Sequence, residues 1–466
     1  MRDYQQVADT VAAEIAAGRL RPGDRLPPQR RFARQHGIAA STASRVYQEL
    51  ARRGLTVGEV GRGTFVRAAD GPEAGPALSE PPDRRVNLEL NHPVVPEQAA
   101  LLAQGLGGLL RPDVLDSALR PVGPAGTPQA RAAAARLLTR AGWRPDPDRV
   151  LFAGNGRQAI SAAVAALVPP GGRLGAEEFT YPVLKSLAGR LGVTVVPLAM
   201  DEEGLVPGAV EAAHRSAPLH AVYVQPTLHN PLSVTMPAAR RADLAAALRR
   251  LDVPAVEDAV WGFLYGDGDG GGGGGDVVAG RAEAAPLAAY APERTVLVDS
   301  MSKRMAPGLT AGFAVVPDAL APGVTAAVRS GGWAPSRFAL EAAVRWESDG
   351  TARALADAKR ADVERRQLLV RHHLAGFAVR GAPRSCFCWW DLPPEWRADL
   401  FVAAAARHGI AVTPGAAFAA DPRRAPGAVR LGLASPPLDT LARALTTLAR
   451  LARSAPEDVL AEEPEK

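Results

Sequence analysis

The sequence predicts an α/β protein in which a small amino-terminal module precedes a large domain built on a mainly parallel sheet. From Val86 onward, short apolar runs alternate with amphipathic, alanine-rich segments, which is the pattern of strands and helices in such a sheet. Before that, three helical patterns are followed by two short strands around a glycine turn. A stretch rich in Pro, Gly and Ala separates the two parts and is typical of a linker. We predict domains at residues 1–68 and 86–452, a linker at 69–85 and a flexible acidic tail at 453–466.

The composition is ordinary for a soluble chain of two or three domains, with 466 residues, 47% hydrophobic and 22% charged. No stretch approaches the roughly eighteen apolar residues of a membrane helix, and the amino terminus has no apolar signal region. We therefore expect a cytoplasmic protein with no membrane partner. Cys386 and Cys388 are too few and too close for a disulfide framework or a metal site, and their apolar neighbours predict a core strand.

Positive charge is concentrated near the amino terminus. Residues 1–68 hold twelve arginines, no lysine and six acidic residues, a net charge of +6 in a chain whose total is +5. A small basic module on a near-neutral body indicates contact with nucleic acid. Charge alone leaves open the alternative of a solvated basic face.

The amino-terminal pattern predicts a winged helix-turn-helix. Apolar residues at helical spacing predict a helix over 4–20, two proline-bearing turns end it, and a second helix follows over 29–37. After a short turn, Ser41 and Thr42 are expected to cap a third helix over 42–54, which Gly54 ends. Residues 55–66 then form two strands around Gly61-Arg62-Gly63.

In such a module the third helix lies in the major groove of DNA and the wing contacts the backbone or minor groove. The predicted DNA-binding residues are Arg30, Ser41, Thr42, Arg45 and Arg62. A small helical oligomerisation module is the alternative. The sequence resembles the GntR-type winged helix of bacterial repressors over nearly all of residues 4–66. The segments that carry the resemblance are "GRLRPGDRLPPQRRFARQHG", "TASRVYQELARRGL" and "GRGTFV". Ala40 stands where many members have an arginine, so base readout is expected to differ there.

In the large domain, apolar strands are predicted at 149–155, 173–179, 193–200, 219–226, 253–260 and 295–300. Ligand groups gather where strands of such a sheet end. The residues that follow these strands include a Gly-Asn-Gly turn opening a helix, an aromatic ring, an amide, a carboxylate, two hydroxyls and a lysine: Gly156, Arg157, Tyr181, Asn230, Asp258, Ser300, Ser302 and Lys303. The glycine run 270–275 is predicted to be a surface insertion with no chemistry.

Pyridoxal 5'-phosphate needs this combination of groups: an anion site, a stacking ring, a carboxylate for its ring nitrogen and a primary amine for its aldehyde. Lys303 is one of four lysines among fifty arginines, and a guanidinium cannot replace its amine because it stays protonated. Helix starts after glycine turns are common, so the Gly-Asn-Gly turn by itself indicates little.

The order Gly-turn, Tyr, Asn-Pro, Asp, Ser-x-Ser-Lys and a late arginine in "AVRLGLA" resembles the fold-type I, aminotransferase class I family across residues 90–450. The resemblance implies a large α/β domain with a smaller carboxyl-terminal α+β subdomain. It also implies Lys303 as the Schiff-base lysine and catalytic residue, Asp258 and Asn230 as ring partners, and Tyr181 as the stacking ring. Phosphate would be held by Ser300, Ser302 and the amides of Gly156 and Arg157, with Arg304 or Arg157 as the cation, and Arg430 would bind an effector or substrate carboxylate. The peptide bond before Pro231 is a candidate for the cis form.

Three positions depart from the family. Val260 and Trp261 stand where a tyrosine is usual, Thr310 stands where most relatives have a phosphate-binding arginine, and the tyrosine expected near Pro121 or Val122 is missing. These departures favour weak transaminase chemistry.

A GntR-type winged helix joined by a linker to an aminotransferase-like domain is similar to the MocR family of bacterial transcriptional regulators over the full length of the chain. This resemblance implies a homodimer that binds a double-stranded DNA operator and senses an amino-compound effector through aldimine exchange at Lys303. The alternatives are an aminotransferase with an accessory DNA-binding domain, and a regulator whose large domain no longer binds the cofactor.

Overall fold

The fold is described from a computed structural model of the chain, which places residues 4–17, 19–21, 23–53, 55–59, 63–66, 86–265 and 284–456. Several predicted features lie outside the described residues. They are Gly54, Gly61 and Arg62 of the module, the linker 69–85, the glycine run 270–275 and the tail from residue 457.

The amino-terminal module is a winged helix-turn-helix, as predicted. Its elements are α1 (Tyr4–Ala16), α2 (Gln29–His36), α3 (Ala40–Arg52) and the antiparallel strands β1 (Thr56–Glu59) and β2 (Gly63–Val66). One apolar core holds them together, with Val11, Phe32, Val46 and Leu50 each at most 2% exposed. The helical spacing of these residues explains why the three helices close around one centre.

The predicted capping role of Ser41 and Thr42 is wrong. Helix α3 begins at Ala40, with Ala39 in an extended conformation as the flanking residue and no side-chain hydrogen bond to this end. Ser41 and Thr42 therefore lie inside the first turn of α3.

The large domain contains a seven-stranded sheet in the order β4-β12-β11-β10-β9-β5-β6. Four neighbouring pairs are parallel, and β12 runs antiparallel to both of its neighbours. The strands are β4 (Val150–Ala153), β5 (Arg173–Glu177), β6 (Thr194–Leu198), β9 (Ala221–Val224), β10 (Ala255–Asp258), β11 (Thr295–Ser300) and β12 (Gly312–Val315). The predicted mainly parallel sheet is confirmed, and β12 is the strand that the sequence reading missed.

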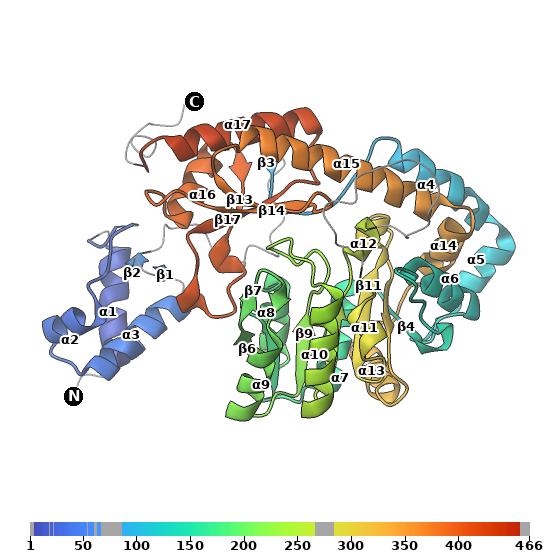
Figure 1. Ribbon diagram of the computed structural model, residues 1–466, viewed down its shortest axis with the longest axis horizontal. Helices are drawn as coiled ribbons and strands as arrows, with labels where there is room; N and C mark the ends of the chain where they lie inside the picture. The colour runs from blue at the N-terminus through green and yellow to red at the C-terminus, as the bar shows by residue number, and fades with distance from the viewer. Residues whose placement is uncertain are drawn as a thin grey trace.

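Helices cover both faces of this sheet (Figure 1). Alternate residues of one strand enter different cores: Tyr223 packs with α7 and α8, whereas Val222 packs with α10 on the opposite face. The helices of the domain are α4 (Gln98–Gly107), α5 (Pro112–Ala118), α6 (Pro128–Leu138), α7 (Gly156–Leu167), α8 (Pro182–Arg190), α9 (Pro207–Ser216), α10 (Ala238–Leu251), α11 (Leu287–Tyr290), α12 (Met301–Arg304), α13 (Ala321–Ser330) and α14 (Arg337–Ser348). Short 3-10 turns are η1 (Gly108–Leu110), η2 (Pro147–Arg149) and η3 (Gly262–Leu264), and β7 (Met200–Asp201) pairs with β8 (Gly204–Leu205).

A smaller α+β subdomain follows, and its long first helix runs along the top of the molecule in Figure 1. A four-stranded sheet, β13-β14-β17-β16, packs against helices, and β15 pairs with β3 from the start of the large domain. Its elements are β3 (Val86–Asn87), α15 (Thr351–His373), β13 (Ala378–Arg380), β14 (Phe387–Asp391), α16 (Ala398–Arg407), β15 (Ile410–Ala411), β16 (Thr413–Pro414), η4 (Gly415–Ala417), η5 (Pro422–Arg424), β17 (Ala428–Gly432) and α17 (Leu438–Arg453). Cys388 lies in buried β14, and Cys386 is buried just before it, as free thiols in the predicted core strand.

The winged module contacts this subdomain (Figure 1). Arg397, at the start of α16, donates a hydrogen bond from Nη1 to the carbonyl oxygen of Gly23 at 2.7 Å. Its guanidinium lies 4.0 Å from the centre of the Phe65 ring in β2, and β1 lies beside η5. A cation over an aromatic ring together with a direct hydrogen bond makes this contact specific.

None of the helices in the described ranges is both long and apolar enough to cross a lipid bilayer.

Candidate functional site: a lysine cavity between the sheet and the small subdomain

Lys303 lies just beyond the carboxyl end of β11, on the short helix α12. Its Nζ donates to the carbonyl oxygen of Asn91 and lies 3.2 Å from Nδ1 of His92. The ring of Trp261 is on another side, with its centre 5.3 Å from Nζ. The amine is thus held by the segment that follows β3 and by the loop that follows β10.

A cavity of about 380 Å³ surrounds this amine. The structure brings together on its wall nine of the residues that the sequence singled out: Gly156, Arg157, Tyr181, Asn230, Asp258, Ser300, Ser302, Lys303 and Arg430. Most of them follow strands of the large sheet, whereas Arg430 comes from β17 of the small subdomain. Arg304, predicted as a cofactor-binding residue, does not line this cavity; its Nη2 donates to Oδ2 of Asp299 at 2.8 Å.

The surroundings of Lys303 favour its neutral amine. Burial is the largest cause and lowers the pKa of Lys303 from its usual value of 10.5 to about 7, and the positive charges of Arg157 and Arg430 act in the same direction. Burial and the charge of Lys303 also lower the pKa of His92, to about 4. A neutral primary amine is the nucleophilic form of lysine, so this site holds a lysine prepared for reaction with a carbonyl group near neutral pH.

Asp258 ends the buried strand β10 and faces the cavity. Burial is the largest influence on its carboxyl group and raises its pKa to about 6. The hydroxyl of Tyr223 donates to Oδ2 at 2.6 Å, and the amide of Val260 donates to Oδ1 at 3.2 Å. Both bonds favour the ionised form, so Asp258 presents a fixed negative charge near pH 7.

The amino end of α7 forms another wall of the cavity. Asn155 caps this helix by accepting a hydrogen bond from the amide of Gln158 at 3.0 Å, so that amide is already used. The close approach of this end to β12 depends on Gly312, because a Cβ there would lie 2.2 Å from the carbonyl oxygen of Asn155. A Cβ on Gly156 would likewise lie 3.0 Å from the Ser300 hydroxyl oxygen. The first turn of α7 and the end of β11 therefore form one narrow cradle suited to an anion.

Two hydroxyl groups and one guanidinium complete this cradle. The hydroxyl oxygens of Ser302 and Thr310 lie 2.7 Å apart and share a neutral hydrogen bond. Arg157 donates from Nε to the hydroxyl of Tyr181 at 3.0 Å. Arg157 is thus the guanidinium that the structure places near the amino end of α7.

Asn230 is 8% exposed, and its Oδ1 has no hydrogen-bond partner among the described residues. The peptide bond that joins it to Pro231 is cis, as the sequence suggested. Arg430 is 6% exposed and donates from Nη2 to the carbonyl oxygen of Glu89 and to the hydroxyl of Thr413 at 3.1 Å. Burial lowers the pKa of Arg430 to about 10, which still leaves it charged at neutral pH. Asn230 and Arg430 therefore bring an unused amide oxygen and a buried positive charge to the cavity.

The donor set fits pyridoxal phosphate. An anion cradle, a fixed carboxylate, an amide with an unused buried oxygen and a neutral amine share one cavity, and this cofactor requires those groups. Within the part of the chain that the structure describes, no group of three or more His, Cys, Asp or Glu side chains is arranged to hold a metal ion.

Sequence reasoning missed two polar neighbours of the site, His92 and Tyr223. His92 is recognisable in "LELNHP" only as a polar residue in an apolar segment, far from Lys303 along the chain. Tyr223 lies inside a fully buried strand, where an aromatic residue is ordinary. Only the fold places these two side chains beside Lys303 and Asp258.

The residues predicted to bind DNA lie on the winged module. Arg30, Ser41 and Arg45 are exposed and Thr42 is half-buried. The Arg45 guanidinium lies 5.9 Å from the centre of the Tyr4 ring. Arg62 lies outside the described residues.

Comparison with known proteins places both parts of the chain. Residues 117–448 match the family described as aminotransferase class I and II, and residues 3–66 match bacterial regulatory proteins of the gntR family. The HTH-type transcriptional regulator YdeF of Bacillus subtilis is 28% identical over 452 residues, which cover 96% of this chain and 94% of YdeF. The probable rhizopine catabolism regulatory protein MocR of Rhizobium meliloti is 27% identical over 399 residues, which cover 80% of this chain and 78% of MocR.

Among solved structures, an archaeal alanine:glyoxylate aminotransferase has a TM-score of 0.69 at 20% identity, and the match covers 79% of this chain and 91% of that one. A likeness at this identity establishes the fold, and it confirms the predicted fold-type I class. The chain therefore belongs to the aminotransferase class I and II family, and its GntR-type amino-terminal domain makes it a transcriptional regulator of the MocR type.

Proposed function

We propose that the chain is a cytoplasmic DNA-binding regulator whose large domain binds pyridoxal phosphate and senses an amino compound at Lys303. The observation that carries this proposal is the position of Lys303. Its amine lies in a cavity of about 380 Å³ together with Asp258, Asn230 and the amino end of α7. This cavity offers each group that the cofactor would need.

The chain's own residues would hold the cofactor in three ways. The amides of Gly156 and Arg157 and the hydroxyls of Ser300 and Ser302 would bind the phosphate. Asp258 would hold a proton at the ring nitrogen, because its carboxylate is fixed and ionised near pH 7. When bound, pyridoxal phosphate supplies an aldehyde that condenses reversibly with primary amines. Asn230 would bind the ring hydroxyl and Tyr181 would pack against the ring.

Arg430 makes a carboxylate-bearing amine the favoured class of effector. Its guanidinium lines the same cavity as Lys303 and is buried, so an anionic group of the effector would meet a desolvated positive charge. Arg430 belongs to β17 of the small subdomain, and the winged module contacts that subdomain through Arg397. An effector that binds Arg430 would thus contact the subdomain against which the DNA-binding module lies.

DNA binding and dimerisation are the other parts of the proposal. Arg30, Ser41 and Arg45 lie on the surface of the module, where a helix of this type enters the major groove. Large apolar side chains are exposed around α5, with Leu110 70% exposed and Leu119 82% exposed. Exposed leucines close together favour an interface with a second copy, and a dimer would present two modules to paired half-sites.

The test is to find where pyridoxal phosphate attaches. The full-length protein is titrated with pyridoxal phosphate, reduced with borohydride and digested, and the modified peptide is identified by mass spectrometry. We expect the label on Lys303. Lys303→Ala should abolish the label, and Lys185→Ala, on α8, should leave it in place. Label spread over several lysines, or none at all, would overturn the proposal.

A second assay separates the sensor from an aminotransferase. Candidate amino acids are added to the loaded protein, with and without a 2-oxo acid, and operator binding and product are measured in parallel. A sensor changes its DNA affinity without accumulating a 2-oxo acid product. Many turnovers per chain would instead show that the protein is an aminotransferase with an accessory DNA-binding domain.

A further inference from the structure

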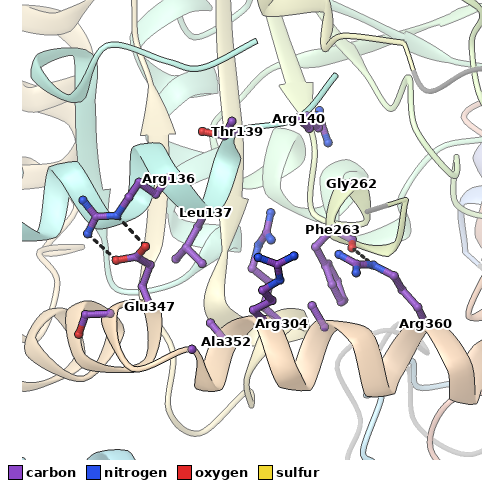
Figure 2. Close-up of a pocket in the computed structure, with 14 residues that line it drawn as sticks. Arg136, Leu137, Thr139, Arg140, Gly262, Phe263, Arg304, Glu347, Ala352 and Arg360 are labelled. Carbon is purple, nitrogen blue, oxygen red and sulfur yellow. Dashed lines mark hydrogen bonds and ion pairs between the residues drawn. The ribbon is translucent and has the colours of Figure 1, made fainter. Parts of the chain in front are cut away.

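A second cavity, of about 360 Å³, lies next to the Lys303 cavity and is rich in arginine (Figure 2). It is bounded by the end of α6, by η3, by the end of α12 and by α14 and α15. Its wall carries one carboxylate, that of Glu347, and five guanidinium groups, those of Arg136, Arg140, Arg304, Arg353 and Arg360. Arginines gathered around a space of this size call for an explanation, because like charges repel unless anions lie among them.

Two of these arginines have a structural role within the chain. Arg136 makes two hydrogen bonds to the carboxylate of Glu347, one of them 2.6 Å long (Figure 2). Arg360 donates from Nε to the carbonyl oxygen of Phe263 at 2.9 Å and also pairs with Asp357. These contacts fix two walls of the cavity.

Arg140 and Arg304 are different, because they are buried and have unused hydrogen-bond donors. Arg140 is 7% exposed, and its Nη2 lies 3.7 Å from Oε1 of Glu257, beyond hydrogen-bond distance. Arg304 is 8% exposed and binds Asp299 through Nη2. Neither Nη2 of Arg140 nor Nε of Arg304 has a hydrogen-bond partner among the described residues. Burying a guanidinium with unused donors is unfavourable, so an additional acceptor in this cavity would stabilise both.

The backbone is adapted to this arrangement at Gly262. A Cβ on this residue would lie 1.5 Å from Nη1 of Arg140, so a larger residue would displace the guanidinium. Figure 2 shows Arg140 directly above Gly262 and Phe263. The missing side chain of Gly262 therefore leaves space for the buried guanidinium of Arg140 at the wall of this cavity.

We propose that this second cavity binds a small oxyanion with several acceptor oxygens, and that the bound anion acts as an effector of the Lys303 cavity. The volume is in the range of small-molecule sites, roughly 300–1,000 Å³. Phosphate and carboxylate groups match the planar guanidinium fork, so phosphorylated metabolites and di- or tricarboxylates share the required chemistry.

The charge balance of the cavity favours an anionic ligand, because one positive charge has no carboxylate partner. Glu257, Asp299, Asp357 and Glu347 pair with four of the five arginines. Arg353, on the exposed side of α15, adds a further positive charge. One negative charge on a bound anion would balance Arg353, and its oxygens would supply acceptors to Arg140 and Arg304.

The two cavities share neighbouring residues, which is the basis for the effector role. Trp261 and Lys303 line the first cavity, whereas the residues that follow each of them, Gly262 and Arg304, line the second. In the same way, Asp258 faces the first cavity and the preceding Glu257 is the ion-pair partner of Arg140. Any movement of an arginine toward a ligand in the second cavity is therefore passed to a residue adjacent to the reactive site.

Lys359 strengthens this connection. It lies on α15, is fully buried, and donates from Nζ to the carbonyl oxygens of Lys303, Arg304 and Met305 at 3.0, 2.8 and 2.9 Å. Helix α15 also supplies Arg353 and Arg360 to the second cavity. One rigid helix thus contacts both the proposed ligand and the backbone of the reactive lysine.

The first test measures anion binding to the full-length protein by calorimetry, with pyrophosphate, inorganic phosphate and citrate as probes. We expect Arg353→Gln to weaken binding of the preferred probe by about tenfold, the loss of one charge-assisted contact. Arg140→Lys keeps the charge, loses the fork and should also weaken binding. Arg450→Gln, on an exposed face of α17, is the matched control and should bind as the wild type does.

Arg157→Gln distinguishes the two cavities, since Arg157 lines only the first. Binding that is lost in Arg157→Gln but kept in Arg353→Gln would overturn the proposal, as would the absence of binding by every probe. Preference for pyrophosphate or for citrate identifies the ligand as a phosphorylated compound or a polycarboxylate, and either supports the site.

The second test reads the effector role without the cofactor. The acetylation rate of Lys303 is measured in the cofactor-free chain, with and without a saturating concentration of the probe. We expect at least a threefold change in the wild type and none in Arg353→Gln, whereas competition in the first cavity would persist in that variant. An unchanged rate in the wild type would overturn the effector role. Because this measurement needs no pyridoxal phosphate, its failure is distinct from failure of the proposed function.

Discussion

The reactivity of Lys303 should follow a pH midpoint of about 7. An ordinary lysine has a pKa of 10.5, and burial with two neighbouring guanidinium groups lowers that of Lys303 to about 7. At pH 7 about half of the Lys303 amines are neutral, against roughly one in three thousand for an unperturbed lysine. The structure therefore predicts an approximately thousandfold larger reactive fraction at neutral pH.

Competitive acetylation with trace acetic anhydride measures this on the cofactor-free, full-length protein. Peptides that contain Lys303, Lys185 and Lys359 are quantified by mass spectrometry from pH 5 to pH 11. Burial also lowers the pKa of Lys185 and of Lys359, each to about 8, so both are internal references. We expect the Lys303 midpoint below the other two, and Arg157→Gln should raise it by removing a nearby positive charge. A Lys303 midpoint above 9 would refute the reasoning.

The same pKa makes a prediction about stability. Between about pH 7 and pH 10.5 the unfolded chain holds a proton on Lys303 that the folded chain has released, so stability rises with pH across this window. At 1.36 kcal/mol per pKa unit, protonation of buried Lys303 lowers the free energy of unfolding by at most about 5 kcal/mol. Lys303→Met removes this cost and should be more stable than the wild type below pH 7, with a difference that shrinks as pH rises. Chemical denaturation at several pH values measures it, and a difference independent of pH would contradict the assignment.

Four further outcomes are expected. Asp258→Asn cannot ionise, so pyridoxal phosphate should bind at least about tenfold more weakly in a spectral titration. Arg430→Ala should keep the cofactor's visible absorption and lose the response of DNA binding to carboxylate-bearing amines in a gel-shift assay. Arg45→Ala and Arg62→Ala should each weaken operator binding and reduce the slope of log affinity against log salt by about one. Leu119→Glu should shift the protein toward monomer in analytical ultracentrifugation, because it places a charge in the exposed apolar surface.

Much of the site was predictable because it follows a simple rule of sheets. Residues that follow parallel strands meet at one edge, so Tyr181, Asp258, Ser300 and Lys303 could be expected to lie together from their places after apolar runs. The residues that escaped prediction obey no such rule. His92 reaches Lys303 from a segment more than two hundred residues earlier, and only the packing of the small subdomain brings it there.

Arg304 shows a different limit of sequence reasoning. As the residue after Lys303 it was a natural candidate for the phosphate, but successive residues on a helix point about 100° apart. On α12 this rotation directs Lys303 into the first cavity and Arg304 toward Asp299 and the second. The sequence shows that Lys303 and Arg304 are adjacent. Which cavity each side chain lines depends on where β11 ends and on how α12 is oriented. The capping prediction for Ser41 and Thr42 failed because α3 begins earlier, at Ala40, with Ala39 as its flanking residue.

Thr310 fits the proposed sensing role better than repeated catalytic turnover. Ser302 and Thr310 form a neutral pair of hydroxyl groups where the family resemblance implies a guanidinium. A charge-assisted hydrogen bond is roughly 1–2 kcal/mol stronger than a neutral one. This corresponds to about five- to thirtyfold weaker phosphate binding. Weak phosphate binding would lower the activity of an enzyme, because a chain that has released its cofactor cannot turn over. A regulator needs only that its two states bind an effector differently. Reversible reaction of an effector amine at Lys303 would meet that requirement even where the cofactor binds with modest affinity.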